Sequence, residues 1–161
     1  MKKILLVLFV MLIASSSFSQ TIKISTMLRF LDTSKDLITD DLISKGFTFS
    51  GKKEEKYDDS YVDLFYWTNP KKPKEDITKV FQYNLNELNE RGLIKTIAIR
   101  YRTASSANYL LIKKELLAAG YKFVVEGDNK GELLSVYSNK KYDFSIWVSP
   151  SGEYDISVKK I

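Results

Sequence analysis

The stretch LITDDLISKGFTF, residues 37–49, returns as LIKKELLAAGYKF at residues 111–123. Apolar, acidic, glycine and aromatic positions coincide at one constant spacing, so that Gly46 corresponds to Gly120. In both places apolar residues recur at helical spacing until the glycine, which can take the left-handed conformation that ends a helix. An aromatic residue and the start of an alternating pattern follow. The repeated stretch therefore predicts a helix that leads into a strand, made twice.

Two further matches extend the repeat in the same order. Residues 63–70 resemble residues 143–150, and this match contains both tryptophans of the chain. Residues 28–30 resemble residues 99–101. Three matches in one order indicate an internal duplication rather than chance.

Each copy is expected to hold one helix and about four strands. Strands are expected at residues 22–31 and 93–102, before the helices, and the charged residues 52–60 are expected to link two strands. Short connections favour antiparallel neighbours. The predicted fold class is α+β, with two tandem copies of a helix plus antiparallel-sheet unit over residues 20–90 and 91–161, and with the helices on one sheet face. The pattern leaves open whether the two sheets join edge to edge or face each other.

Residues 1–19 have the layout of a secretory signal peptide, which consists of a basic start, an apolar run and a small polar exit. The basic start is Lys2 and Lys3, and the run over residues 4–13 is too short to span a bilayer, which needs roughly 20 residues. Cleavage is expected near Ser19–Gln20. The sequence therefore predicts an exported protein, periplasmic or extracellular, and the alternative is an apolar element of the fold itself.

The composition excludes several classes of function. The chain of 161 residues contains no cysteine and no histidine. It therefore cannot form a disulfide, a Ser-His or Cys-His dyad, a Cys/His zinc site, or a lipid anchor on cysteine. The net charge of +5 is too mild to indicate nucleic acid. Hydrophobic residues make up 44% of the chain, which is enough for a core without disulfides.

The candidate binding residues are Asp63, Trp67, Asp143 and Trp147. Strand alternation puts them on the sheet face away from the helices, where an acid beside an indole could hold a peptide or a sugar. The alternative is that both tryptophans are buried. The faces expected to meet the helices are Val62, Leu64 and Tyr66 in the first copy and Tyr142, Phe144 and Ile146 in the second.

Paired carboxylates are the one catalytic chemistry that the composition leaves reasonably open, since glycosidases hold two carboxyl groups roughly 5–10 Å apart. The candidates are Asp63, Asp143 and the pair Asp58–Asp59. The helix acids Asp40, Asp41 and Glu115 are expected to be solvated. A catalytic role is therefore the weaker expectation, and no catalytic residue is assigned.

No cofactor and no metal are expected. The chain contains neither a phosphate-binding loop nor a dinucleotide fingerprint. Residues 127–132 carry oxygen ligands, but Lys130 stands where a calcium loop needs another oxygen, so this stretch is interpreted as a hairpin turn.

The export segment ending in Ser-Phe-Ser-Gln and the repeated Lys-Gly-Phe-x-Phe unit resemble small exported proteins of Bacteroidetes-type bacteria, a resemblance that implies no activity. The tandem architecture is similar to that of the β-lactamase inhibitor protein and of SmpA-like modules, which implies a fold only. The expected function is an exported, non-catalytic binding module for a protein, peptide or envelope glycan, without membrane insertion of the mature chain. A carboxylate-dependent hydrolase of the cell envelope is the alternative.

Overall fold

The computed structural model describes residues 22–57, 60–71, 77–83, 96–129 and 131–161. The predicted signal peptide, the acids Asp58 and Asp59, and the expected boundary between the copies at residues 90 and 91 lie outside these residues. Within the described part, no helix has the length and apolarity needed to cross a membrane.

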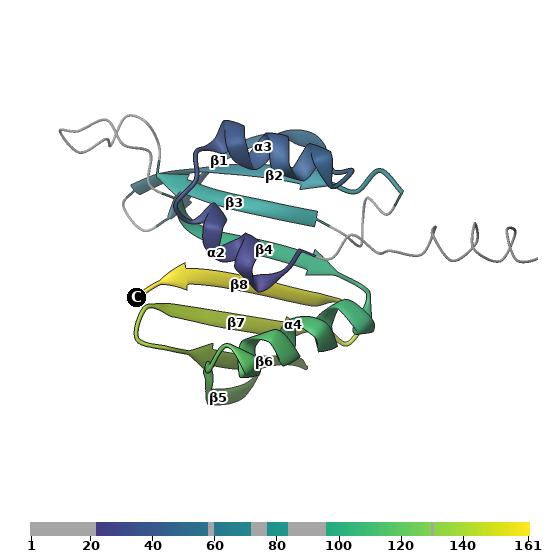
Figure 1. Ribbon diagram of the computed structural model, residues 1–161, viewed down its shortest axis with the longest axis vertical. Coiled ribbons are helices and arrows are strands. Elements are labelled where there is room, and N and C mark those ends of the chain that lie inside the picture. Colours follow the sequence, from purple (N-terminus) through teal and green to yellow (C-terminus); the bar gives the residue numbers. More distant parts are fainter. Residues whose placement is uncertain (1–21, 58–59, 72–76, 84–95, 130) are drawn as a thin grey trace, which may run out of the picture.

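The chain is α+β with antiparallel strands, as predicted. In chain order its elements are α2 (Ile24–Phe30), α3 (Lys35–Ser44), β1 (Thr48–Tyr57), β2 (Ser60–Thr68), β3 (Ile77–Tyr83), β4 (Thr96–Thr103), α4 (Ser106–Ala118), β5 (Lys122–Asn129), β6 (Glu132–Ser138), β7 (Tyr142–Val148) and β8 (Tyr154–Lys160). The strands form one sheet in the order β1-β2-β3-β4-β8-β7-β6-β5 (Figure 1). The strands after α3 and those after α4 therefore meet edge to edge, at β4 and β8.

Both long helices end in the same way. Gly46 and Gly120 have φ values of 77° and 78°, and their N–H groups donate to the carbonyls of Ile43 and Leu117. The next residue in each case, Phe47 or Tyr121, also donates back to the last helical turn. Both helices lead into a strand with a β-bulge in its first residues, between Phe49 and Gly51 in β1 and between Phe123 and Val125 in β5. The helix-to-strand passage predicted at the repeated stretch is confirmed at both places.

The first helix corrects an expectation, because residues 22–31 were expected to form a strand. Ile24, Met27 and Phe30 are buried, and their spacing of three residues is that of one helix face. The backbone N–H of Ile24 donates to a carboxylate oxygen of Glu115 in α4 at 3.1 Å. This bond satisfies one of the free N–H groups at the start of α2, so Glu115 is not simply solvated, as expected from sequence.

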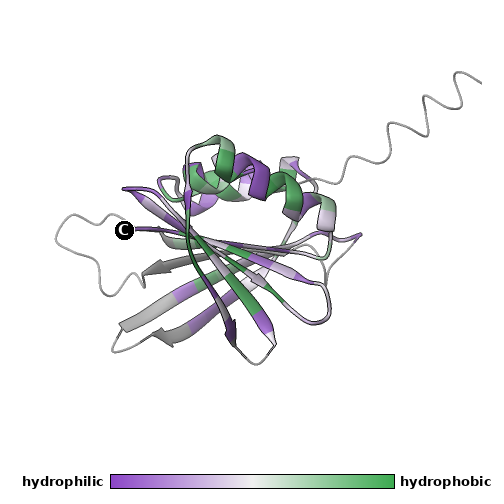
Figure 2. Ribbon diagram, turned by 90° about the horizontal axis from the view of Figure 1, so that it is seen from below, coloured by the Kyte–Doolittle hydropathy of each residue, from purple (hydrophilic) through white to green (hydrophobic). Residues whose placement is uncertain are grey.

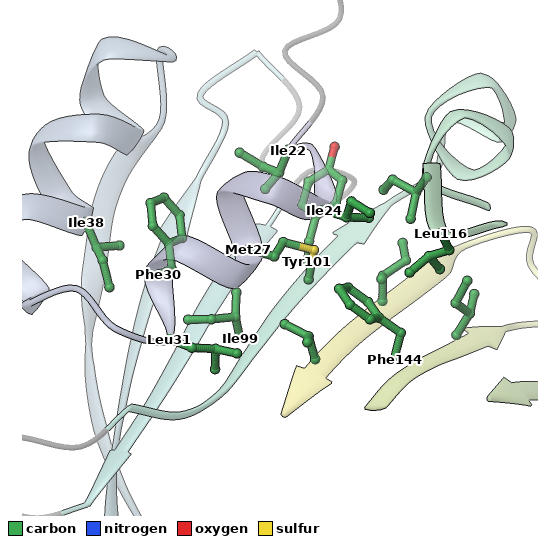
Figure 3. Packing of buried hydrophobic residues seen from close by; sticks show 14 of the residues in the cluster. Ile22, Ile24, Met27, Phe30, Leu31, Ile38, Ile99, Tyr101, Leu116 and Phe144 are labelled. Atoms are coloured by element: carbon green, nitrogen blue, oxygen red, sulfur yellow. The ribbon is translucent and has the colours of Figure 1, made fainter. Parts of the chain in front are cut away.

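The core lies between the helices and the sheet (Figure 2). Residues of α2 contact both β4 and α4, and residues of α3 contact β1. Figure 3 shows α2 above β4, with Met27 directed toward Tyr101. On the next strands Phe144, Ile156 and Val158 belong to the same buried cluster. Helix α2 therefore covers the seam at which β4 pairs with β8.

Strand β2 turns the opposite face to the core from the one predicted. Trp67 is fully buried in the core cluster, and Lys35 of α3 lies over the ring of Phe65, with 5.7 Å between Nζ and the ring centroid. Leu64 and Tyr66 lie on the other face, where Tyr66 covers Gly51. Alternation alone allowed either choice, because both faces of β2 carry large apolar residues. In β7 the prediction holds for Phe144 and Ile146, which are buried.

Two smaller expectations also change. Residues 52–57, expected to belong to a charged linker, are part of β1. The apolar stripes of α3 and α4 are narrower than the sequence suggests, because only one residue of each adjacent apolar pair is buried. The buried members are Ile38, Leu42, Ile112 and Leu116, and the exposed members are Leu37, Ile43, Leu111 and Leu117.

We predict that Phe30→Ala lowers the free energy of unfolding by about 3–5 kcal/mol, because it leaves a cavity in the core under α2. Leu37→Ala removes an apolar side chain that is 61% exposed and should change stability by less than about 0.5 kcal/mol. Chemical denaturation of both variants provides the test. Equal losses would mean that α2 does not pack as described.

Asp41 joins α2 to α3. Arg29 lies 3.0 Å and Lys45 2.8 Å from Asp41 Oδ1. Burial raises the pKa of Asp41, but the hydrogen bonds from Lys45 and Arg29 and the attraction of both cations bring it below its ordinary value of 3.8. Because the folded pKa is depressed, this stabilisation is present above the unfolded pKa and is lost as the pH falls through the folded value.

We predict that Asp41→Asn lowers the free energy of unfolding at pH 7 by about 1 kcal/mol, since its pairs are partly exposed. The difference from the wild type should shrink below about pH 4 and disappear in stronger acid. Urea denaturation across this range measures it, with the exposed neighbour Asp40→Asn as the control. A difference that stays constant with pH would contradict the assigned ion pairs.

Candidate functional site

The outer face of the sheet, defined as the face turned away from the core cluster, carries a polar row across three strands. Trp147 in β7 lies opposite Asp155 in β8, and Asp155 lies opposite Arg102 in β4. Directly opposed residues of antiparallel strands share a face, and the chain neighbours Ile146 and Ile156 point into the core. The row therefore spans the seam between β4 and β8.

Two arginines hold Asp155 in this row. Arg102 donates to Asp155 Oδ2 from Nη2 at 3.1 Å and from Nε at 3.3 Å. Arg100, two residues earlier on the same face, places its Nε 3.2 Å from Oδ1. The carboxylate side chain is only 15% exposed, so the ion pairs form in a partly desolvated place. Asp155 orients the guanidinium of Arg102 through two hydrogen bonds and attracts that of Arg100 through the ion pair.

A hollow of about 260 Å³ opens beside this row. Its lining residues are Arg100, Arg102, Glu132, Trp147, Ser149, Glu153 and Asp155. Trp147 is half-buried and forms its largest apolar wall. The hollow is smaller than the roughly 300–1,000 Å³ of pockets for drug-sized ligands, so it suits one ring or one side chain.

The chemistry of the hollow combines an aromatic surface with polar groups of both signs. The indole of Trp147 offers a flat ring for stacking and an N–H donor. Guanidinium groups donate hydrogen bonds, whereas the carboxylates of Glu132 and Glu153 accept them. A ligand that carries hydroxyl groups can use both kinds of partner, because each hydroxyl donates and accepts.

The structure separates the two predicted acid-indole pairs. Trp67 is fully buried and cannot stack on a ligand, so for this residue the alternative of a buried tryptophan holds. Asp63 is also buried, on the core side of β2, and Lys52 Nζ lies 2.9 Å from its Oδ2. Among the described residues, the other carboxylate oxygen of Asp63 and the Nε1 of Trp67 have no hydrogen-bond partner. This pair is an element of packing.

The second pair lies on the outer face, as alternation predicts. Trp147 lines the hollow. Asp143 stands four residues earlier in β7, opposite Lys159 of β8, and is not among the lining residues. The sequence match also treats Trp67 and Trp147 as equivalent residues of the two copies, and the sheet does not place them in equivalent strands. Trp67 is in the second strand after its helix and Trp147 in the third, so Tyr137 occupies the place of Trp67.

Sequence reasoning missed Asp155 and four further charged residues of the hollow. These four residues come from three parts of the chain. Arg100 and Arg102 alternate with Ile99 and Tyr101 in β4, so their outward direction could have been inferred. Their meeting with Asp155 could not, since it depends on the pairing of β4 with β8. Glu132 and Glu153 stand beside turns and give no signal in sequence.

The remaining polar candidates are explained by local structure. A hairpin joins β5 to β6 where it was expected, and the amide of Gly131 donates to Asp128 Oδ1 at 3.0 Å within it. The turn is shorter than the expected residues 127–132, because residues 127–129 still belong to β5. Among the described residues, no group of three or more acids could hold a metal ion. Comparison with protein-family models, curated proteins and solved structures gave no match.

We predict that the two tryptophans differ sharply in their access to solvent. A Trp67→Phe variant, which keeps Trp147, should show an acrylamide quenching constant several-fold larger than a Trp147→Phe variant, which keeps Trp67. Burial excludes the quencher from Trp67, whereas Trp147 borders an open hollow. Similar quenching in the two variants would place both indoles in the same environment and contradict the assigned faces.

Proposed function

We propose that the protein is an exported, non-catalytic binding module that holds its ligand at the Trp147 hollow. A protein, a peptide and an envelope glycan were the expected ligand classes, and a glycan suits the hollow best. The observation that carries this proposal is the half-buried indole that lines the hollow beside groups that both donate and accept hydrogen bonds. The two arginines of the hollow face three carboxylates, those of Asp155, Glu132 and Glu153, so the charges nearly balance. This balance favours a neutral hydroxylated ligand over a strongly charged one.

Export is proposed from the first 19 residues, with their basic start, short apolar run and small polar exit. The absence of cysteine agrees with either an oxidising or a reducing compartment. The folded chain would begin at Ile22, which is fully buried and stands just after the expected cleavage near Ser19–Gln20. On this proposal the mature chain works in the periplasm or outside the cell.

We also propose that the chain is a tandem duplication with its helices on one sheet face. Three features support it: the matching helix ends at Gly46 and Gly120, the two bulges at equivalent places, and a sheet order in which each helix is followed by four strands. The division between the units then falls between β4 and α4 rather than near residue 90. The expected match of residues 28–30 with 99–101 drops out, because the first is helical and the second is extended.

The proposed function predicts saturable binding of soluble envelope glycan fragments that depends on Trp147. Trp147→Ala should weaken binding at least tenfold, since stacking on an aromatic ring and closure of the wall are both lost. Isothermal titration with glycan fragments and with unrelated peptides measures the preference. Tyr66→Ala, an aromatic change on the same outer face but outside the hollow, is the matched control.

Binding that survives Trp147→Ala unchanged, or that falls equally in Tyr66→Ala, would sink the proposed site. A strong preference for peptides over glycans would keep the hollow and change its ligand class. Asp143→Asn should leave binding unaltered, because this acid does not line the hollow.

A carboxylate-dependent hydrolase of the cell envelope is the second candidate. It is favoured by the convergence of Glu132, Glu153 and Asp155 on one hollow. Asp155 is engaged by both arginines, so Glu132 and Glu153 would be the acid and base. Glycan release that is abolished by Glu132→Gln or Glu153→Gln, with binding retained, would select this function over simple binding.

A further inference from the structure

Each of the two long helices keeps a row of exposed residues opposite its buried ones. The α3 stripe consists of Asp36, Leu37, Asp40 and Ile43. The α4 stripe consists of Leu110, Leu111, Lys114 and Leu117. Members of the two stripes occupy equivalent places, because each stands the same number of residues before the glycine that ends its helix.

The stripes expose large apolar side chains to an unusual extent. In the α3 stripe Leu37 is 61% and Ile43 55% exposed. In the α4 stripe their counterparts Leu111 and Leu117 are 40% and 55% exposed, and Leu110 is 60% exposed. Single exposed leucines are normal on a protein surface, but a row of them on each of two helices marks an interaction surface.

The charges of the stripes are opposite. Lys114 stands at the place of Asp40, and Leu110 stands at the place of Asp36. Lys113, beside Lys114, adds a further cation, and the nearby hydroxyls of Tyr109 and Tyr137 raise its pKa, so it stays charged. The α3 stripe is therefore acidic and apolar, whereas the α4 stripe is basic and apolar. Each stripe is the chemical complement of the other.

A recess beside α3 offers space for side chains of the α4 stripe. It measures about 350 Å³ and is lined by Lys35, Asp36, Thr39, Asp40 and Phe49. Phe49 provides an apolar wall, and Asp40 provides the acidic edge, because Asp36 is paired with Lys35. Lys35 pairs with Asp36 and lies over the ring of Phe65, so it does not cancel the acidity at Asp40. A leucine followed by a lysine one helical turn later, as in Leu110 and Lys114, matches this recess.

We propose that the occupant is a second copy of this chain, with the α4 stripe of each copy docked on the α3 stripe of the other. Both stripes belong to the same molecule, so a two-fold arrangement makes the contact twice and closes the assembly as a dimer. The charge complementarity between the stripes, together with the recess, selects a second copy over an unrelated partner. The outer face with the Trp147 hollow stays free in this dimer, so the proposal does not depend on the proposed function.

Sedimentation equilibrium of the purified protein from about 10 µM to about 1 mM tests the dimer. Asp40→Lys and Lys114→Glu each place like charges in both contacts and should each raise the dissociation constant about tenfold or more. An equimolar mixture of the two variants should associate as the wild type does, because the heterodimer has opposite charges in both contacts. Recovery in the mixture also shows that both variants are folded.

Lys53→Glu is the matched control, because it reverses one exposed charge on the outer face of β1, away from the stripes. It should leave association unchanged, whereas Leu117→Gln should weaken it. A wild type that remains monomeric at about 1 mM, an open series of larger oligomers, or a variant mixture that fails to associate would each overturn the proposal. A chain that stays monomeric but binds another protein through these stripes would overturn it as well.

Discussion

The pairing of β4 with β8 is the interaction on which the rest of the structure depends. The strands after α3 and those after α4 would otherwise form two separate antiparallel meanders, each with an unpaired edge strand. Joining them buries Ile99 and Tyr101 beside Ile156 and Val158 and makes one continuous core. Helix α2 then covers the seam, and the bond from Glu115 to the start of α2 ties it to α4, far along the chain. The seam is thus closed on the core side by packing under the buried face of α2.

The same pairing creates the candidate site on the other side of the sheet. Arg100 and Arg102 come from β4, whereas Asp155 comes from β8 and Trp147 from the next strand. The hollow therefore forms only where strands from both halves of the described sheet meet. The ion pairs across the seam also orient the guanidinium groups before any ligand arrives, which reduces the ordering that binding requires.

How far the sequence predicts this molecule depends on the range over which each feature is determined. The helix-to-strand passages at Gly46 and Gly120 were predicted because the information is local: an apolar helix, a glycine and an aromatic residue in succession. Helix α2 was not, because its seven residues are too short to be stable alone and its helical form depends on burial and on Glu115. The face that β2 turns to the core was predicted wrongly for a related reason. Phe65 and Leu64 are both apolar, and only the neighbouring helix decides which one faces the core.

For the candidate site, alternation in β7 predicts that Trp147 and Asp143 point outward, and the structure places them there. Trp67 lies on the core face because β2 turns the opposite face to the core from the one predicted. The two tryptophans are not equivalent residues either, since they stand in different strands of their meanders. Aromatic identity is a weak guide to equivalence, because Tyr137 fills the place of Trp67 with a similar ring contact. Phe123 lies 5.7 Å from Tyr137, and Phe49 lies 5.4 Å from Trp67, between ring centroids.

The most direct test of the central claim, that β4 and β8 join the chain into one sheet, is a nuclear Overhauser spectrum of the isotope-labelled protein. The account predicts backbone contacts between opposed residues of the two strands, such as Tyr101 with Ile156 and Ile99 with Val158. Backbone contacts confined to residues before α4 on one side and after α4 on the other, with none between β4 and β8, would contradict it.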